Sequence, residues 1–73
     1  MSTEIMNIKL DQFGEACSVA IELIKNHDFV TARTELSFAA DILLQIAANK
    51  KGTEKAKMLK KAKMLYEIAG SIC

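Results

Sequence analysis

The sequence predicts an all-α fold, an antiparallel up-down-up bundle of three helices, and three observations support it. The 73 residues include no proline and only three glycines, a composition that suits helices better than turn-rich β folds. Apolar residues recur at alternating steps of three and four along three segments, as on one face of a helix. Short breaks at residues 26–28 and 49–53, rich in capping and turn residues, separate the segments. A chain of this length is expected to form a single domain, residues 1–73.

The first helix is expected over residues 8–25. Its apolar side chains fall on one face, which is predicted to be core: Leu10, Phe13, Cys17, Ala20 and Ile24.

The second helix is expected over residues 29–48, with Asp28 as its N-cap because a carboxylate can accept the free N–H groups of a first turn. Its core line comprises Phe29, Ala32, Leu36, Ala39, Leu43 and Ile46. Further apolar residues lie on both flanks of this line, with Ala40, Leu44 and Ala47 on one flank and Phe38 and Ile42 on the other. Such a broad apolar surface is typical of a central helix with two neighbours.

The third helix is expected over residues 54–72, with Thr53 as its N-cap. Its core line comprises Met58, Ala62, Leu65, Ala69 and Ile72. Short connections favour antiparallel neighbours, and an apolar period of 3.5 favours near-parallel axes with a left-handed twist.

The third segment also carries a second line, which a terminal helix does not need for its core. Leu59, Lys63, Tyr66 and Gly70 follow one another at steps of four, three and four residues. These residues are predicted to line a groove beside the second helix that accepts an amphipathic helix. The facing wall is either Phe38 with Ile42 or Ala40 with Leu44, because the handedness of the bundle decides which flank faces the third helix.

The charge distribution leaves an alternative function open. Residues 1–49 carry seven acidic and three basic side chains, and residues 50–73 carry seven lysines and two acidic side chains. A basic third helix could bind nucleic acid or an anionic membrane. The lysines do not form one stripe, however, and no base-stacking aromatic platform accompanies them. These features favour an ordinary solvated helix surface, with any membrane contact indirect.

No constellation of residues indicates catalysis. The lone histidine, His27, has no second histidine or nearby cysteine with which to bind a metal. The acidic residues fall singly along predicted polar faces, and no glycine-rich phosphate loop occurs. We therefore expect no enzyme activity, no cofactor and no small-molecule substrate. Cys17 and the terminal Cys73 are expected to be reduced, and with no signal peptide or membrane span in the sequence the cytoplasm is the expected location.

Two stretches resemble the MIT domain, the microtubule-interacting and trafficking module. Residues 20–32 read Ala-Ile-Glu-Leu-Ile-Lys-Asn-His-Asp-Phe-Val-Thr-Ala, which is similar without a gap to the family's Ala-Val-Glu-Leu-Asp-Lys-Ala-Gly-Asn-Tyr-Glu-Glu-Ala. Residues 65–69, Leu-Tyr-Glu-Ile-Ala, are similar to the family's Tyr-Leu-x-Arg-Ala. The chain departs from the family at three positions. Ile24 stands where the family has an aspartate, Ile68 stands where it has an arginine, and Gly70 stands where an acidic residue is common.

The resemblance implies a function in trafficking, membrane remodelling or cell division. MIT domains bind short helical C-terminal motifs of ESCRT-III filament proteins, either between the second and third helices or between the first and third. Many are fused to AAA-ATPases or act with them. Tyr66 matches a family position that contacts the first class of ligand. Because Ile68 and Gly70 are uncharged and Lys63 lies in the same line, the ligand is expected to be more acidic than is usual for the family.

Overall fold

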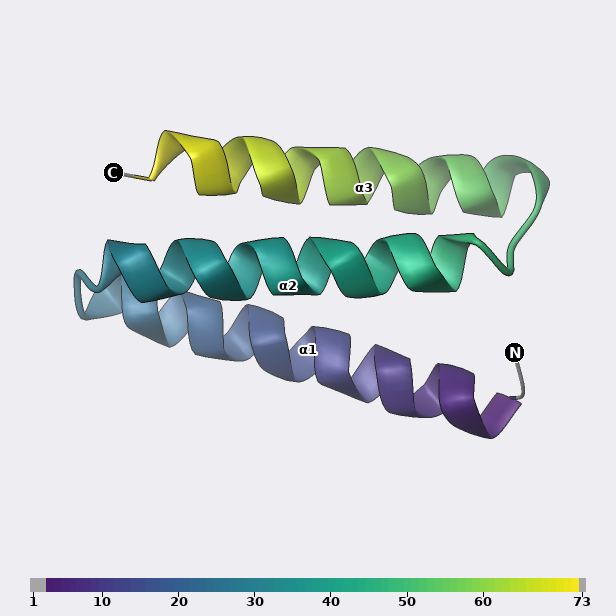
Figure 1. The fold of residues 1–73 in the computed structure, drawn as a ribbon, viewed down its shortest axis with the longest axis horizontal. Helices are drawn as coiled ribbons and strands as arrows, with labels where there is room; N and C mark the ends of the chain where they lie inside the picture. The colour runs from purple at the N-terminus through teal and green to yellow at the C-terminus, as the bar shows by residue number, and fades with distance from the viewer. Residues whose placement is uncertain (1–2, 73) are drawn as a thin grey trace.

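The computed structural model describes residues 3–72 and contains three helices, α1 (Thr3–Lys25), α2 (Phe29–Ala47) and α3 (Gly52–Ser71). Successive helices run in opposite directions (Figure 1), so the predicted all-α, up-down-up architecture is confirmed. The predicted bounds of the second and third helices agree to within two residues. α1 begins five residues before its predicted start, and its first turns are mostly exposed.

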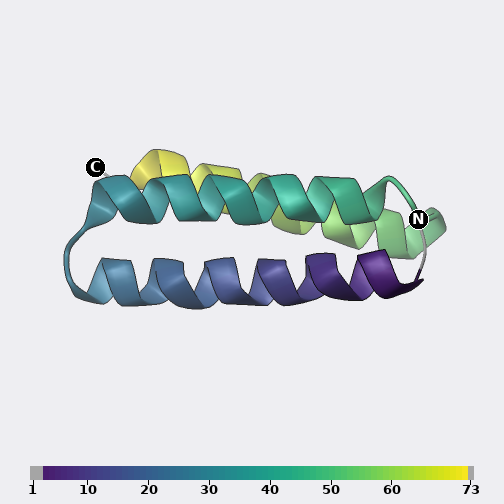
Figure 2. The ribbon, with the colours of Figure 1, turned by 60° about the horizontal axis from the view of Figure 1, so that its bottom comes forward.

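α2 is the centre of the fold. It packs against α1 on one side and against α3 on the other, whereas no Cα atom of α1 lies within 8 Å of a Cα atom of α3. In Figure 1, α2 lies between α1 and α3. In Figure 2, which shows the molecule from another direction, α2 lies in front of α3. The bundle is therefore left open between α1 and α3.

The buried core consists mainly of alanine, which lets helix axes approach closely. Its small members are Ala16, Ala20, Ala32, Ala39, Ala40, Ala47, Ala62 and Ala69, and its large members are Leu36, Ile42, Leu43 and Ile46. Eight of these twelve belong to α2 and include five of the six residues of its predicted line, whereas the sixth, Phe29, is half-buried. No polar side chain is buried among the described residues, so apolar packing holds the helices together.

The open arrangement shows in the dimensions of the molecule. The accessible surface is 4928 Å² for a mass of 8.0 kDa, whereas a compact monomer of that mass exposes about 4450 Å². The radius of gyration is 12.6 Å, against about 11.2 Å for a compact domain of this length. The prediction that Leu10 belongs to the core is wrong, because its side chain is 43% exposed. A third helix packed directly on α1 would have covered it.

The connection between α1 and α2 is a helix-ending motif with a non-glycine residue in the left-handed conformation. Asp28 N–H donates to Leu23 O at 2.8 Å, and His27 N–H donates to Ile24 O at 3.0 Å. This is the hydrogen-bond pair of a Schellman motif, and His27 holds its left-handed position with φ of 61°. The predicted N-cap is confirmed, since Asp28 Oδ1 accepts from Thr31 N–H at 3.3 Å.

His27→Gly is expected to stabilise the fold by about 0.5–1 kcal/mol. The left-handed conformation costs a non-glycine residue about 1–2 kcal/mol, while the edge-on contact of His27 with Phe29 offsets part of that cost. Urea unfolding followed by circular dichroism measures the difference. Lys25→Gly, inside the last turn of α1, is the control and should lower the stability by up to about 1 kcal/mol. A less stable His27→Gly variant would show that the ring contact outweighs the strain.

The connection between α2 and α3 differs from the prediction. Lys51 is the N-cap residue of α3 and makes no side-chain cap hydrogen bond, so the prediction of Thr53 as N-cap is wrong. Gly52 has φ of 62°, a left-handed turn that glycine adopts without strain and that brings the chain back onto α2. Thr53 is thereby placed inside the first turn. Lys50 Nζ lies 3.6 Å from Glu54 Oε1 across the same turn.

Three further predictions from the sequence concern the two cysteines and membrane-spanning helices. Cys17 is half-buried rather than core, and burial raises the pKa of its thiol. Cys73 lies outside the described residues. Within the described part of the chain, no helix is long and apolar enough to cross a membrane.

Candidate peptide-binding groove between α2 and α3

An open apolar groove of about 430 Å³ runs between α2 and α3. Its lining residues are Leu44, Leu59, Ala62, Lys63, Tyr66 and Glu67. Leu44 comes from α2, and every other member projects from α3. The large apolar side chains Leu44, Leu59 and Tyr66 are each more than a third exposed, while Ala62 is buried and forms the floor. The groove therefore offers an apolar surface that the fold itself does not cover.

Tyr66 spans the groove and is tied to α2. Its hydroxyl donates a hydrogen bond to Asp41 Oδ1. The pKa of the Tyr66 phenol is raised, first by this hydrogen bond and then by desolvation and the charge of the Asp41 carboxylate. Tyr66 therefore stays neutral at physiological pH, and the Asp41 carboxylate is the charged group beside it.

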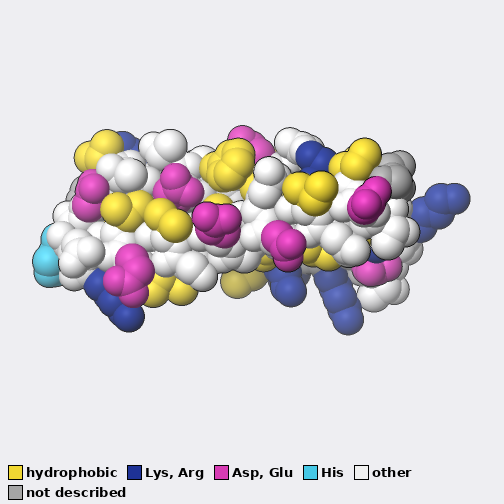
Figure 3. All heavy atoms as spheres, turned by 90° about the horizontal axis from the view of Figure 1, so that it is seen from below, with side chains coloured by type: hydrophobic (Ala, Val, Ile, Leu, Met, Phe, Trp, Pro, Cys, Tyr) yellow, Lys and Arg dark blue, Asp and Glu magenta, His cyan; other side chains and the backbone are white. Residues whose placement is uncertain are grey.

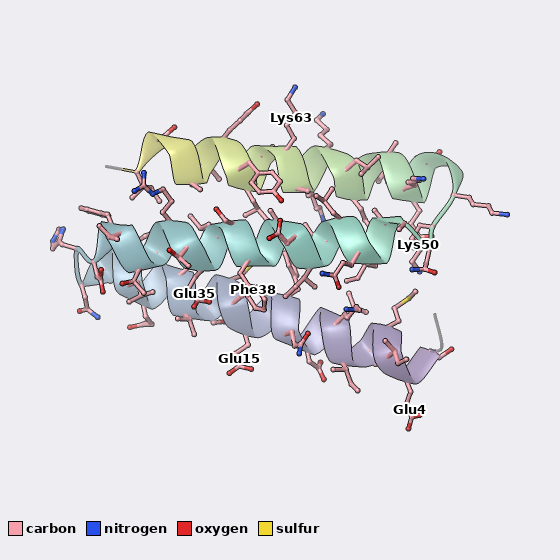
Figure 4. All side chains as sticks on the ribbon, in the orientation of Figure 1. Glu4, Glu15, Glu35, Phe38, Lys50 and Lys63 are labelled. Carbon is pink, nitrogen blue, oxygen red and sulfur yellow. The ribbon has the colours of Figure 1, made fainter. Side chains whose placement is uncertain are left out.

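The charged residues of the groove have opposite signs. Lys63 lines the groove with its aliphatic stem, and its ammonium end points away from α2 (Figure 4). Glu67 lies one helical turn further along α3 and is exposed. An amphipathic helix in this groove would meet a cation and a carboxylate along one edge.

The structure brings together four of the predicted site residues, namely Leu44, Leu59, Lys63 and Tyr66. It also decides which flank of α2 faces α3, because Ala40 packs with Leu43 and Ala62 in a buried cluster. Ala40 itself lies beneath the surface and does not line the groove. The groove wall on α2 is thus Leu44, a choice that sequence periodicity left open.

Three other predicted residues lie elsewhere. Phe38 is on the side of α2 that faces α1 (Figure 4), and Ile42 is buried. Gly70 is exposed and does not line the groove, and a Cβ atom at this position would meet nothing within 4 Å. No close approach of a neighbouring helix therefore requires glycine at position 70. The apolar spacing does not identify Asp41 or Glu67 as residues of the site, because a polar residue on an exposed helix face gives no periodic signal.

Two further grooves flank the remaining helix pairs. The α1–α2 groove, of about 300 Å³, is lined by Gln12, Glu15, Ala16, Val19, Glu35 and Phe38. The α1–α3 groove, of about 180 Å³, is lined by Phe13, Lys61, Met64, Leu65 and Ile68. The α2–α3 groove is the largest of the three and the one that the sequence pattern predicts.

The lining of the α2–α3 groove is mostly apolar. Its polar groups are one ammonium, one carboxylate and one phenol, and the side chains between them are apolar. No group of three or more histidine, cysteine, aspartate or glutamate residues that could hold a metal ion occurs within residues 3–72. The absence of enzyme activity stays a prediction.

Comparison with known proteins adds no family to this description. No protein-family model, no curated protein and no solved structure matches the chain. The three-helix all-α bundle is shown by the structure, and the similarity to MIT domains remains a resemblance of residues.

Proposed function

We propose that the α2–α3 groove binds a short amphipathic helix of another protein. The observation that carries the proposal is the row of exposed apolar side chains, Leu44, Leu59 and Tyr66, along one continuous groove. Clustered apolar surface on a small soluble domain usually marks an interaction site. A helix that presents leucines at positions i, i+3 or i+4, and i+7 would place them along such a groove.

The expected ligand carries acidic residues beside its leucines. Seven lysines lie between residues 50 and 63, against two glutamates in residues 50–73. Such a surface steers acidic ligands and raises the association rate more than the affinity. Glu67 provides one carboxylate for a single basic residue of the ligand, whereas Ile68 and Gly70 provide none.

We further propose that the chain acts as an MIT-like module, and that its ligands are helical C-terminal motifs of ESCRT-III-like filament proteins. The resemblance of residues 20–32 and 65–69 supports this, and so does the position of Tyr66 in the groove where the resemblance places a ligand contact. The module would act in the cytoplasm in trafficking, membrane remodelling or cell division, fused to or working with an AAA-ATPase. It would reach membranes only through the filament.

Titration of the domain with fluorescent C-terminal peptides of ESCRT-III-like proteins tests the proposal. We expect a dissociation constant in the micromolar range, because one helix in a groove buries less than the roughly 1200 Å² of a stable interface. Raising NaCl from about 0.1 to 0.5 M should weaken binding by less than about tenfold, since most of the contact is apolar and only the charged edge is screened.

Duplex DNA and acidic lipid vesicles serve as the comparison ligands. If the α3 lysines bound phosphates, affinity for DNA would fall steeply, by about a thousandfold between 50 and 200 mM salt for six or more contacts. Strong, salt-labile binding to DNA or vesicles, with no peptide binding, would favour a basic helix that recognises nucleic acid or membrane and would overturn the proposed function.

A further inference from the structure

The α1–α2 groove is a second candidate interaction surface with different chemistry. Ala16, Val19 and Phe38 form its apolar part, and Glu15 and Glu35 provide one carboxylate from each helix. Phe38 is 50% exposed, although an aromatic side chain gains most from complete burial. A partner that covered Phe38 would gain apolar contact and meet negative charge on both walls.

The negative charge of this groove is not neutralised within the molecule. Neither Glu15 nor Glu35 forms an ion pair with a residue of the described range 3–72, where the pairs are Lys25–Glu22 and Lys50–Glu54. Glu35 lies beside Phe38, and Glu15 projects from the edge of α1 (Figure 4). Seen from the α1 side, acidic side chains run the length of the molecule between apolar patches (Figure 3). The matching partner is therefore a helix with both lysines and apolar residues on one face.

The chain itself carries such a helix face. Lys57, Lys61, Met64 and Ile68 follow one another at steps of four, three and four residues and so share one stripe of α3. All four are exposed, Met64 by 51%, and neither lysine has an ion-pair partner among the described residues. The stripe is about 17 Å long at 1.5 Å per residue. It lies on the side of α3 away from Leu59 and Tyr66, toward the α1–α3 groove.

We propose that the α1–α2 groove of one copy binds the α3 stripe of a second copy. Met64 and Ile68 of the stripe pack on Phe38 and Val19, while the two lysines pair with Glu15 and Glu35. The charges determine which surfaces can meet, because the stripe is basic and the groove is acidic. Two stripes or two grooves facing each other would bring like charges together. This proposal does not rest on the α2–α3 groove, which stays free in the assembly.

The proposed contact is heterologous, since each copy offers one groove and one stripe. Heterologous contacts either close into a ring or continue as an open chain, so the average mass rises with concentration. A single stripe of four side chains buries an area at the lower end of protein interfaces, so association is weak and reversible. Salt weakens it, because exposed charge pairs are screened at high ionic strength.

Sedimentation equilibrium and concentration-dependent NMR shifts of the whole chain provide the first test. At about 1 mM protein in low salt, the average mass should rise above the 8.0 kDa of the monomer and return toward it in about 0.5 M NaCl, where the Debye length is under 5 Å. The shifts should map to the α1–α2 groove and the α3 stripe. Phe38→Asp should abolish association, whereas Tyr66→Asp should leave it unchanged. A monomer at every concentration, or shifts confined to other surfaces, would overturn the proposal.

Charge reversal provides the sharper test. One variant combines Glu15→Lys with Glu35→Lys, and the other combines Lys57→Glu with Lys61→Glu. Each alone places like charges on groove and stripe and should stay monomeric, while an equimolar mixture should associate at least as well as the parent. Glu15, Lys57 and Lys61 are exposed and Glu35 is half-buried, and none of the four has an ion pair within residues 3–72, so circular dichroism should show the parent fold for both variants. A mixture that stays monomeric, or a single variant that still associates, would refute the pairing of these two surfaces.

Discussion

Leu43→Ala is expected to lower the free energy of unfolding by about 2–5 kcal/mol, the range for buried leucines truncated in well-packed cores. Leu43 is 3% exposed and lies in a buried cluster with Ala40 and Ala62, against which Phe13 and Leu65 also pack. It therefore joins all three helices. A chain of this length is expected to have a total stability of about 4–11 kcal/mol, so one such truncation removes a large part of it. Urea unfolding followed by circular dichroism at 222 nm measures the loss.

Leu44→Ala is the matched control, since it makes the same chemical change one residue further along the same helix. The Leu44 side chain is 38% exposed and faces the α2–α3 groove, so its truncation should cost less than about 1 kcal/mol. The pair separates loss of core packing from any general effect of alanine in α2. Equal losses for the two variants would mean that the buried cluster does not hold the helices together as described.

The difference between Leu43 and Leu44 shows how far periodicity reaches. The three-and-four spacing in α2 identifies its buried side, because the central helix has a neighbour on each side and every residue of the line from Ala32 to Ile46 is buried. The same spacing in α1 includes Leu10, which remains exposed. A periodic pattern locates the apolar face of one helix, but burial also depends on where the next helix lies. The separation of α1 and α3 could not be predicted from either helix alone.

The candidate groove could be predicted in part for the same reason. The line of Leu59, Lys63 and Tyr66 follows from spacing within one helix, and the structure places all three along the groove. Its opposite wall, Leu44 and not Phe38, depends on the handedness with which α1 and α3 flank α2. Local periodicity does not contain that information. The partner of Tyr66, Asp41, is 25 residues away in sequence, so no local pattern could connect them.

Tyr66→Asp is expected to weaken binding of an ESCRT-III-like helical peptide by at least about thirtyfold, which corresponds to a loss of about 2 kcal/mol at a central interface residue. Tyr66 is 39% exposed and belongs to neither buried cluster of the core, so the domain should keep its helical spectrum. The substitution removes the aromatic wall of the groove and adds a negative charge near Asp41, which an acidic ligand would also meet. Peptide titration by fluorescence anisotropy measures the affinity.

Two further variants decide what a change at Tyr66 means. Tyr66→Phe keeps the ring and removes only the hydrogen bond to Asp41, so it should bind within about threefold of the parent if the apolar wall dominates. Met64→Asp introduces the same charge at an exposed apolar position on the other side of α3, in the α1–α3 groove, and should leave peptide binding intact. If Met64→Asp lost binding while Tyr66→Asp kept it, the peptide would lie between α1 and α3. If Tyr66→Asp unfolded the domain, Tyr66 would belong to the packing of α2 on α3, because the same charge at a solvent-facing ligand site would not disturb the fold.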